Sequence, residues 1–191
     1  GKNRLTTGKE MNSDIGALAV YDSSLYVGQG FPAINDIPTS KITKWDGKKW
    51  TYAGNALACV DAFAVYYNQL YAGGKFNLQV EDMKDYYIAR WDGKNWLPAS
   101  RGTDDLVLSL SVHNGLLYAG GTFTHAGNTN AENIATWNGM QWGYAGSSIN
   151  GFVLALCKYK GELYAGGSFT TNANTANYIA KWSEGKKKHK K

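Results

Sequence analysis

The sequence is poor in the residues that mark cross-links, metal centres and membrane spans. Among 191 residues it has two cysteines, three histidines and three prolines. Neither Cys59 nor Cys157 has a second Cys or His at ligand spacing, so we expect two buried free thiols, no disulfide and no metal site. No apolar run approaches the roughly 18 residues of a transmembrane helix. No signal peptide opens the sequence, but a cleaved one would leave no trace, so the compartment stays unknown, with a secreted or extracellular location favoured over the cytoplasm.

The sequence also lacks the patterns of an active site. It contains no Gly-x-Ser-x-Gly, no phosphate-binding loop and no group of histidines and carboxylates at ligand spacing. His113 stands where Tyr21, Tyr66 and Tyr159 stand in other parts of a repeat, so we interpret it as a substituted structural residue. We therefore expect a protein that is not an enzyme and that needs no cofactor.

A seven-residue motif occurs four times, at spacings of 45, 47 and 46 residues. It reads LYVGQGF at Leu25–Phe31, LYAGGKF at Leu70–Phe76, LYAGGTF at Leu117–Phe123 and LYAGGSF at Leu163–Phe169. A second phrase, I-x-x-W, keeps step with the first and ends at Trp45, Trp91, Trp137 and Trp182. After the first three come Asp-Gly or Asn-Gly and a further tryptophan, at Trp50, Trp96 and Trp142. A period in the forties with strand-like segments indicates a repeat architecture.

Each repeat predicts four antiparallel strands. The first strand alternates strictly, as in Val60–Val65, and has one face of small residues, which is typical of strands packed very closely. The LYAGG strand, the I-x-x-W strand and an outer strand that begins at the second tryptophan complete the unit, and Asp-Gly or Asn-Gly dipeptides favour a tight hairpin between the last two. We predict an all-β protein, a β-propeller of four blades with four antiparallel strands each. The expected single domain covers 1–185, with blades at about 13–54, 58–100, 105–146 and 151–183 plus 3–8, and a basic tail at 186–191.

The fourth repeat lacks an outer strand in its own sequence. Arg4–Gly8 aligns with Trp50–Gly54, so we expect this N-terminal strand to complete the last blade and to close the ring. Two alternatives remain open. Two chains could exchange these strands and form an eight-bladed ring, which makes the chain a monomer or a strand-exchanged dimer, or the chain could be part of a longer array.

The repeat resembles those of kelch-type propellers. A Gly doublet after an apolar strand, followed by a Trp and a turn, carries the resemblance, and the fuller phrase LYAGGTFTHAGNTNAENIATWNG is similar to repeats of bacterial kelch-like propellers and of fungal cell-polarity markers. The likeness covers about residues 13–183. It implies a propeller that acts as a binding platform. The first repeat departs from the pattern, because Gly28-Gln-Gly30 replaces the doublet.

The long loops of the repeats lie on one side of such a meander. They cover 32–40, 77–87, 124–133 and 170–178, and variable loops on a rigid scaffold commonly carry binding residues. With the segments that join the repeats, this side carries nine carboxylates against three cations, whereas most lysines lie elsewhere. The predicted acidic side would attract a basic partner, and the basic side anionic ones. Nucleic-acid binding is not expected, because the tryptophans belong to the repeat frame rather than to the basic stretches.

We expect a noncatalytic binding or scaffolding module that binds a protein partner on the acidic side. The alternatives are a carbohydrate-binding module and a subunit of a larger assembly. Tyrosine rings beside amides and carboxylates are what a sugar site uses for stacking and for hydroxyl bonding, although the same tyrosines could merely cap the sheet. The candidate contact residues are Tyr86, Tyr87, Asp82, Asp85, His125, Asn130, Asn174 and Tyr178.

Overall fold

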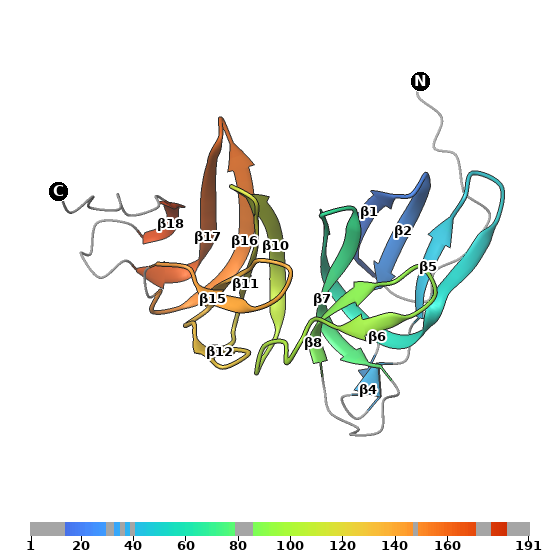
Figure 1. Cartoon of the computed structure of the whole chain (residues 1–191), viewed down its shortest axis with the longest axis horizontal. Coiled ribbons are helices and arrows are strands. Elements are labelled where there is room, and N and C mark those ends of the chain that lie inside the picture. The colour runs from blue at the N-terminus through green and yellow to red at the C-terminus, as the bar shows by residue number, and fades with distance from the viewer. Residues whose placement is uncertain are drawn as a thin grey trace.

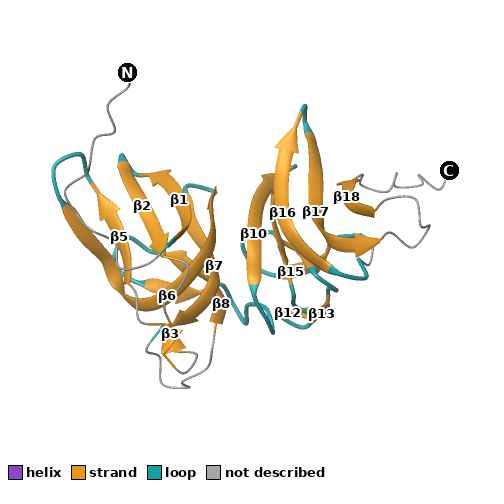
Figure 2. Cartoon of the chain, turned by 180° about the vertical axis from the view of Figure 1, so that it is seen from behind, coloured by secondary structure: helices purple, strands orange, loops and turns teal. Residues whose placement is uncertain are grey.

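The protein is all-β in the part of the chain that its computed structural model describes, which covers residues 14–29, 33–34, 37–38, 41–78, 86–146, 149–170 and 177–182. All sheets are antiparallel, as the alternating apolar pattern predicted. The strands follow each other along the chain as four successive meanders, which we call units one to four (Figures 1 and 2).

Units one and two share a single seven-stranded sheet. Its strands are β1 (Ile15–Tyr21), β2 (Ser24–Gln29), β5 (Lys41–Trp45), β6 (Trp50–Tyr66), β7 (Gln69–Asn77), β8 (Tyr86–Trp91) and β9 (Trp96–Pro98). The sequence predicted an outer strand and a separate first strand where the structure has β6. This one strand pairs with β5 through its first part and with β7 through its second part. It changes partner beyond Gly54, whose φ of 75° lies in the left-handed region that favours glycine.

Units three and four are separate sheets. Unit three contains β10 (Val107–His113), β11 (Leu116–Gly121), β14 (Ile134–Trp137) and β15 (Trp142–Tyr144). Unit four contains β16 (Phe152–Tyr159), β17 (Glu162–Thr170) and β18 (Asn177–Trp182), so it has three strands within the described ranges. Two short hairpins lie in the long loops, β3 (Ala33–Ile34) with β4 (Ile37–Pro38) and β12 (His125–Ala126) with β13 (Thr129–Asn130). The predicted closing strand Arg4–Gly8 lies outside the described residues.

The first strand of every unit carries the same irregularity. Its register with the second strand shifts after the opening residue, between Ile15 and Ala17 in unit one and at the equivalent positions of the other units, Val60/Ala62, Val107/Ser109 and Val153/Ala155. A β-bulge at this point increases the local twist of the strand pair. The repeat in the sequence is therefore a repeat in backbone geometry as well.

The units pack side by side through their first strands. β1 lies against β6, β6 against β10 and β10 against β16, and units two and three stand between units one and four in Figure 1. The first glycine of each doublet makes this packing possible. A β-carbon on Gly28, Gly73 or Gly120 would collide with the opening valine of the next unit, which is Val60, Val107 and Val153 respectively.

The tryptophans join neighbouring units at the outer strands. The indole Nε1 of Trp96 donates to the carbonyl oxygen of Ala53 at 2.9 Å, and Trp142 donates in the same way to Ala99 at 3.2 Å. In unit four Trp182, from the third strand, takes this role and donates to Ala145 at 2.8 Å. These side chains are buried, so they belong to the packing between units, as their fixed repeat positions indicated.

Candidate functional site

The long-loop side of unit three is the best-described part of the predicted binding surface. The β12–β13 hairpin lies there, at the bottom of Figure 1, whereas the β16–β17 turn lies at the top. The hairpin is tied to the segment before β10, because Thr103 bridges Ala126 and the amide of Gly127 donates to the carbonyl of Gly102 at 2.7 Å. Gly127 has a φ of 59° and a β-carbon there would press on Trp142, so glycine is required at the hairpin tip.

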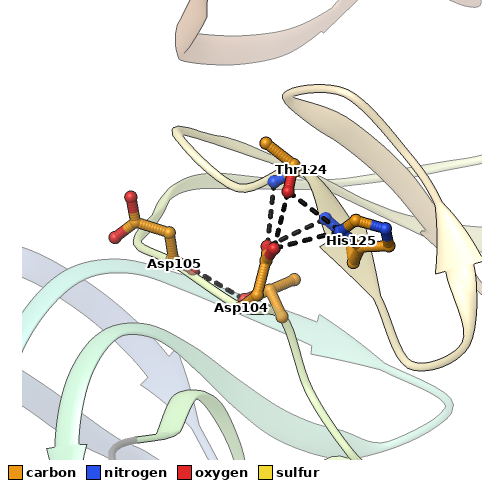
Figure 3. A network of polar contacts seen from close by, with 5 residues as sticks. Asp104, Asp105, Thr124 and His125 are labelled. Atoms are coloured by element: carbon orange, nitrogen blue, oxygen red, sulfur yellow. Dashed lines mark hydrogen bonds and ion pairs between the residues drawn. The ribbon is translucent and has the colours of Figure 1, made fainter.

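Asp104 is the centre of a polar network that joins this segment to the hairpin (Figure 3). Its Oδ1 accepts the backbone amides of Thr124 and His125, both at 2.8 Å. Its Oδ2 accepts the Thr124 hydroxyl at 2.6 Å and lies 3.2 Å from His125 Nδ1. The carbonyl of His125 in turn accepts the Asp104 amide at 3.1 Å. The carboxylate thus accepts two backbone amides of the loop that follows β11.

These hydrogen bonds set the ionisation of Asp104. Partial burial alone would raise the pKa of this carboxyl, but the donors from Thr124 and His125 outweigh burial and lower the pKa below its ordinary value. Asp104 is therefore ionised at neutral pH, and its carboxylate faces His125 Nδ1 at 3.2 Å. The His125 and Asp104 side chains are both largely exposed, which screens this ion pair.

The network has the residue types of a hydrolase triad but not the arrangement. In a triad the imidazole takes a proton from the nucleophile with one nitrogen and is held by the carboxylate through the other. Here His125 Nδ1 lies 2.9 Å from Thr124 Oγ1 and also faces Asp104, while the Thr124 hydroxyl donates to the carboxylate. The hydroxyl is thus used as a donor rather than activated as a nucleophile.

Unit four repeats the same link without ionisable groups. Asn150 stands where Asp104 stands, its Oδ1 accepts the Thr170 amide at 2.7 Å, and its Nδ2 lies 2.6 Å from the Thr170 hydroxyl. An amide can replace the carboxylate because both accept the backbone amide of the residue after the LYAGG-x-F phrase. The link is therefore a structural part of the repeat, and His125 is the addition that unit three makes to it.

A polar depression of about 230 Å³ opens beside the hairpin. Its lining combines a guanidinium, two amides, hydroxyls and the edge of a buried indole, from Ser100, Arg101, Gly127, Asn128, Thr129, Gln141 and Trp142. Arg101 reaches across it, with Nη1 3.5 Å from Asn128 Oδ1. The Thr129 hydroxyl donates to the Trp142 carbonyl at 3.3 Å and holds one wall in place. The depression offers several hydrogen-bond donors and acceptors to a polar ligand.

The structure brings together some of the predicted site residues and separates others. His125 and Asn130 face each other across the β12–β13 hairpin. Tyr86 and Tyr87 are half-buried at the start of β8 and pack against two core clusters, as capping residues do. Tyr178 lies in β18 of unit four, 69% exposed and with a φ of 68°. Asp82, Asp85 and Asn174 lie outside the described residues.

Sequence reasoning missed several residues of this surface. Arg101 and Gln141 lie outside the repeated phrases and the long loops, and the depression that they form with Asn128 arises where three separate segments meet. Asp104 could have been found, because it and Asn150 occupy equivalent positions three residues before Val107 and Val153. Asp61, at the bulge of β6, was also missed. Burial raises the pKa of its carboxyl to about 6, and no partner group for it is found among the described side chains.

One expectation about the cysteines was wrong. Both thiols are free, as predicted, and Cys59 is buried, but Cys157 is exposed. The reason is its position on the outward face of β16, the first strand of the last unit. The same face of β10 carries Ser111 and is covered by β16, whereas no further unit covers Cys157 in the described part of the chain.

Exposed carboxylates gather on the described loops around the β12–β13 hairpin. Asp104, Asp105 and Glu132 are exposed around the hairpin and the segment before β10, with Arg101 as the neighbouring cation. Lys158 and Lys160 are exposed at the opposite end of unit four. Within the described ranges, no three His, Cys, Asp or Glu side chains are grouped closely enough to hold a metal ion. No helix in those ranges is long and apolar enough to cross a membrane.

Comparisons with known proteins define the fold rather than the activity. No family model and no curated protein matches the chain. Among solved structures it is similar to the computationally designed Ika4 protein, at 17% identity and a TM-score of 0.60, over 97% of this chain and 100% of that one. The designed Ika8 protein matches at 16% identity and a TM-score of 0.50, over 85% of this chain and 47% of the other. The chain therefore spans about half the length of Ika8. An α-L-arabinofuranosidase from Clostridium thermocellum matches with a TM-score of 0.41 and 15% identity, over 92% of this chain and 69% of the enzyme.

Proposed function

We propose that the chain is a noncatalytic binding module of the β-propeller type, in which the four units are blades, and that it binds a protein partner on the long-loop side of unit three. The observation that carries this proposal is the exposed set His125 on the β12–β13 hairpin, Glu132 after it and Asp105 in the segment before β10. Backbone contacts between Thr103 and Ala126 and between Gly127 and Gly102 hold the hairpin and that segment together. Loops held rigidly on a sheet lose little conformational entropy when they bind.

The polar network supports a structural role for Asp104 and Thr124, which are residue types that a hydrolase triad would use. Asp104 accepts three hydrogen bonds, one of them from the Thr124 hydroxyl, and it also faces His125 Nδ1. Asn150 fulfils the same role in unit four. The exposed carboxylates Asp105 and Glu132 then remain to attract a partner that presents Lys or Arg, and such charge pairs mainly accelerate association.

Charge reversal tests this proposal. Partners captured by the wild-type chain are compared with those captured by Asp105→Lys and Glu132→Lys, singly and together. Lys94→Glu is the charge-reversal control, since Lys94 is exposed on the β8–β9 turn of unit two and belongs to neither surface. We expect the double variant to lose a basic partner at least tenfold and the control to retain it. A partner that binds all variants equally would exclude this surface.

Carbohydrate binding is the second candidate, and the depression beside the hairpin favours it. Amides and a guanidinium bond sugar hydroxyls well, and the lining of Arg101, Asn128 and Gln141 provides them. On a glycan array, Asn128→Ala and Gln141→Ala should abolish any signal if this is the function. A glycan signal that survives both substitutions would place the sugar elsewhere, and the absence of any signal favours the protein partner.

A further inference from the structure

The junctions between neighbouring units share a glycine–valine contact, and the first two junctions add a tyrosine hydrogen bond. The first glycine of the doublet receives the opening valine of the next unit, as Gly28 does with Val60 and Gly120 with Val153. The last residue of the first strand reaches the next turn. The Tyr21 hydroxyl donates to the carbonyl of Asn68 at 3.0 Å, and the Tyr66 hydroxyl to that of Gly115 at 2.8 Å. The chain therefore shows what a complete junction looks like.

The forward surface of unit four has one half of this junction. A β-carbon on Gly166 would meet nothing closer than the Tyr178 carbonyl oxygen of the same unit, at 3.7 Å. Tyr159, the counterpart of Tyr21 and Tyr66, has 57% of its surface exposed. Tyr164 is only half-buried, although its counterparts Tyr26, Tyr71 and Tyr118 are buried in the earlier junctions. In the described part of the chain, no residue fills the space beside Gly166 as Val60, Val107 and Val153 fill the earlier junctions.

The backward surface of unit one has the other half. Ile15 pairs with Gln29 as Val60 pairs with Gly74, so it is the counterpart of the inserted valines. Ile15 is 42% exposed, whereas Val60, Val107 and Val153 are fully buried. Leu18, on the face that packs backward in later units, is 60% exposed, while its counterpart Leu156 is buried. The β1–β2 turn supplies the carbonyl of Ser23, which corresponds to that of Asn68.

We infer that two copies of this chain join end to end, each inserting Ile15 against Gly166 of the other, to form a closed ring of eight units. The two junctions would be related by a twofold axis. The two surfaces are complementary, because unit four presents the open glycine Gly166 and unit one presents the exposed side chain of Ile15. Within one chain they lie on opposite ends of the row of units, with units two and three between them (Figure 1).

Charge at the two surfaces agrees with this pairing. Lys160 is exposed in the β16–β17 turn beside Tyr159, and its Nζ lies 5.3 Å from the centre of that ring. Asp22 is exposed in the turn that would receive the Tyr159 hydroxyl. In the complete junctions the strand end lies against the turn of the next unit, so a junction between copies would place Lys160 near Asp22. The inference uses no part of the binding surface of unit three.

Mass in solution tests the inference. Light scattering coupled to gel filtration should give twice the 20.9 kDa of one chain for the wild type. Gly166→Val should give the mass of one chain with an unchanged circular dichroism spectrum, because the new side chain blocks Ile15 of the other copy, while its β-carbon comes no closer than 3.7 Å to the Tyr178 carbonyl oxygen of its own unit. Ile15→Asp is a second variant, at an exposed position, and should have the same effect from the other surface.

Thiol reactivity supplies an independent reading. Cys157 lies on the forward face of β16, so it should react slowly with a thiol reagent in the wild type and at least tenfold faster in Gly166→Val. A wild-type mass of one chain would overturn the inference, as would an open polymer of more than two chains. It would also be overturned if both variants kept the wild-type mass and thiol rate.

Discussion

His113, at the end of β10, departs from the repeat and has a buried ring nitrogen without a partner among the described residues. His113 stands where Tyr21 and Tyr66 donate to the next turn, and its Nδ1 is buried and makes no hydrogen bond among the described residues. A buried polar atom without a partner costs about 1–3 kcal/mol. The equivalent acceptor in the next turn is the carbonyl of Gly161.

We therefore expect His113→Tyr to stabilise the protein. The tyrosine hydroxyl should reach the Gly161 carbonyl and raise the free energy of unfolding by about 1 kcal/mol. His113→Phe is the matched control, since it keeps the ring and removes the hydroxyl. Urea unfolding of the three proteins measures the effect. If the tyrosine and phenylalanine variants were equally stable, the proposed hydrogen bond would not form.

Asp61 makes stability depend on pH in the direction opposite to most carboxylates. Burial raises its pKa to about 6 from an ordinary 3.8. Between about pH 4 and 6 the folded protein keeps a proton that the unfolded chain releases, so the free energy of unfolding falls as the pH rises through this interval and stays lower above it. Since the carboxyl is partly exposed, solvent reduces the effect to about 1 kcal/mol.

Asp61→Asn should abolish this dependence. The variant is expected to be more stable than the wild type at pH 7 and equally stable at pH 4. Urea unfolding at intervals across this range, with Glu132→Gln as an exposed control, isolates the contribution of Asp61 from that of other carboxylates. A constant difference between wild type and Asp61→Asn at all pH values would show that the ionisation of Asp61 is not involved.

At the scale of the strands, the close approach of neighbouring units depends on one atom per junction. Gly120→Ala should destabilise the protein by about 2 kcal/mol, because its β-carbon collides with Val153 across the junction. Val153→Ala removes the obstructing methyl groups and should restore part of the loss in the double variant, as denaturant unfolding would measure. Additive losses would mean that the two residues do not meet.

The strands and their order were predictable from the sequence for a simple reason. The nearly constant spacing of LYAGG and I-x-x-W, with the hairpin dipeptides of the first three units, predicts where the strands lie. Asp46 Oδ1 accepts the amides of Lys48 and Lys49 at 2.8 Å, as such a turn requires. The same capping recurs at Asp92 and Asn138. These features are local, so a short segment of sequence determines them.

The features that the sequence did not predict depend on contacts between units, which the sequence of one repeat does not contain. The continuity of β6 depends on which sheet each half of the strand pairs with. The exposure of Cys157 depends on whether a further unit covers β16. The depression around Arg101 requires three segments to meet, and none of them signals the others in the sequence. The residues that line this depression are therefore the least predictable part of the structure.

At the scale of the molecule, the two unlike end surfaces link stability to concentration. If folding and assembly are coupled through the Ile15–Gly166 junction, dilution favours the unfolded chain by mass action. The melting temperature of the wild type should rise by a few degrees for each tenfold increase in protein concentration, since about 1.4 kcal/mol of free energy accompanies that change.

Gly166→Val provides the comparison that makes this measurement decisive. It should melt at one temperature regardless of concentration, and below the wild type, because its forward surface stays exposed to water. Differential scanning calorimetry across a hundredfold range of concentration would show the difference. Equal and concentration-independent melting of both proteins would mean that the exposed ends contribute nothing to stability. Whether or not the partner on the loop side is a protein, that outcome would leave Ile15, Leu18 and Tyr159 as surface residues without a shared function.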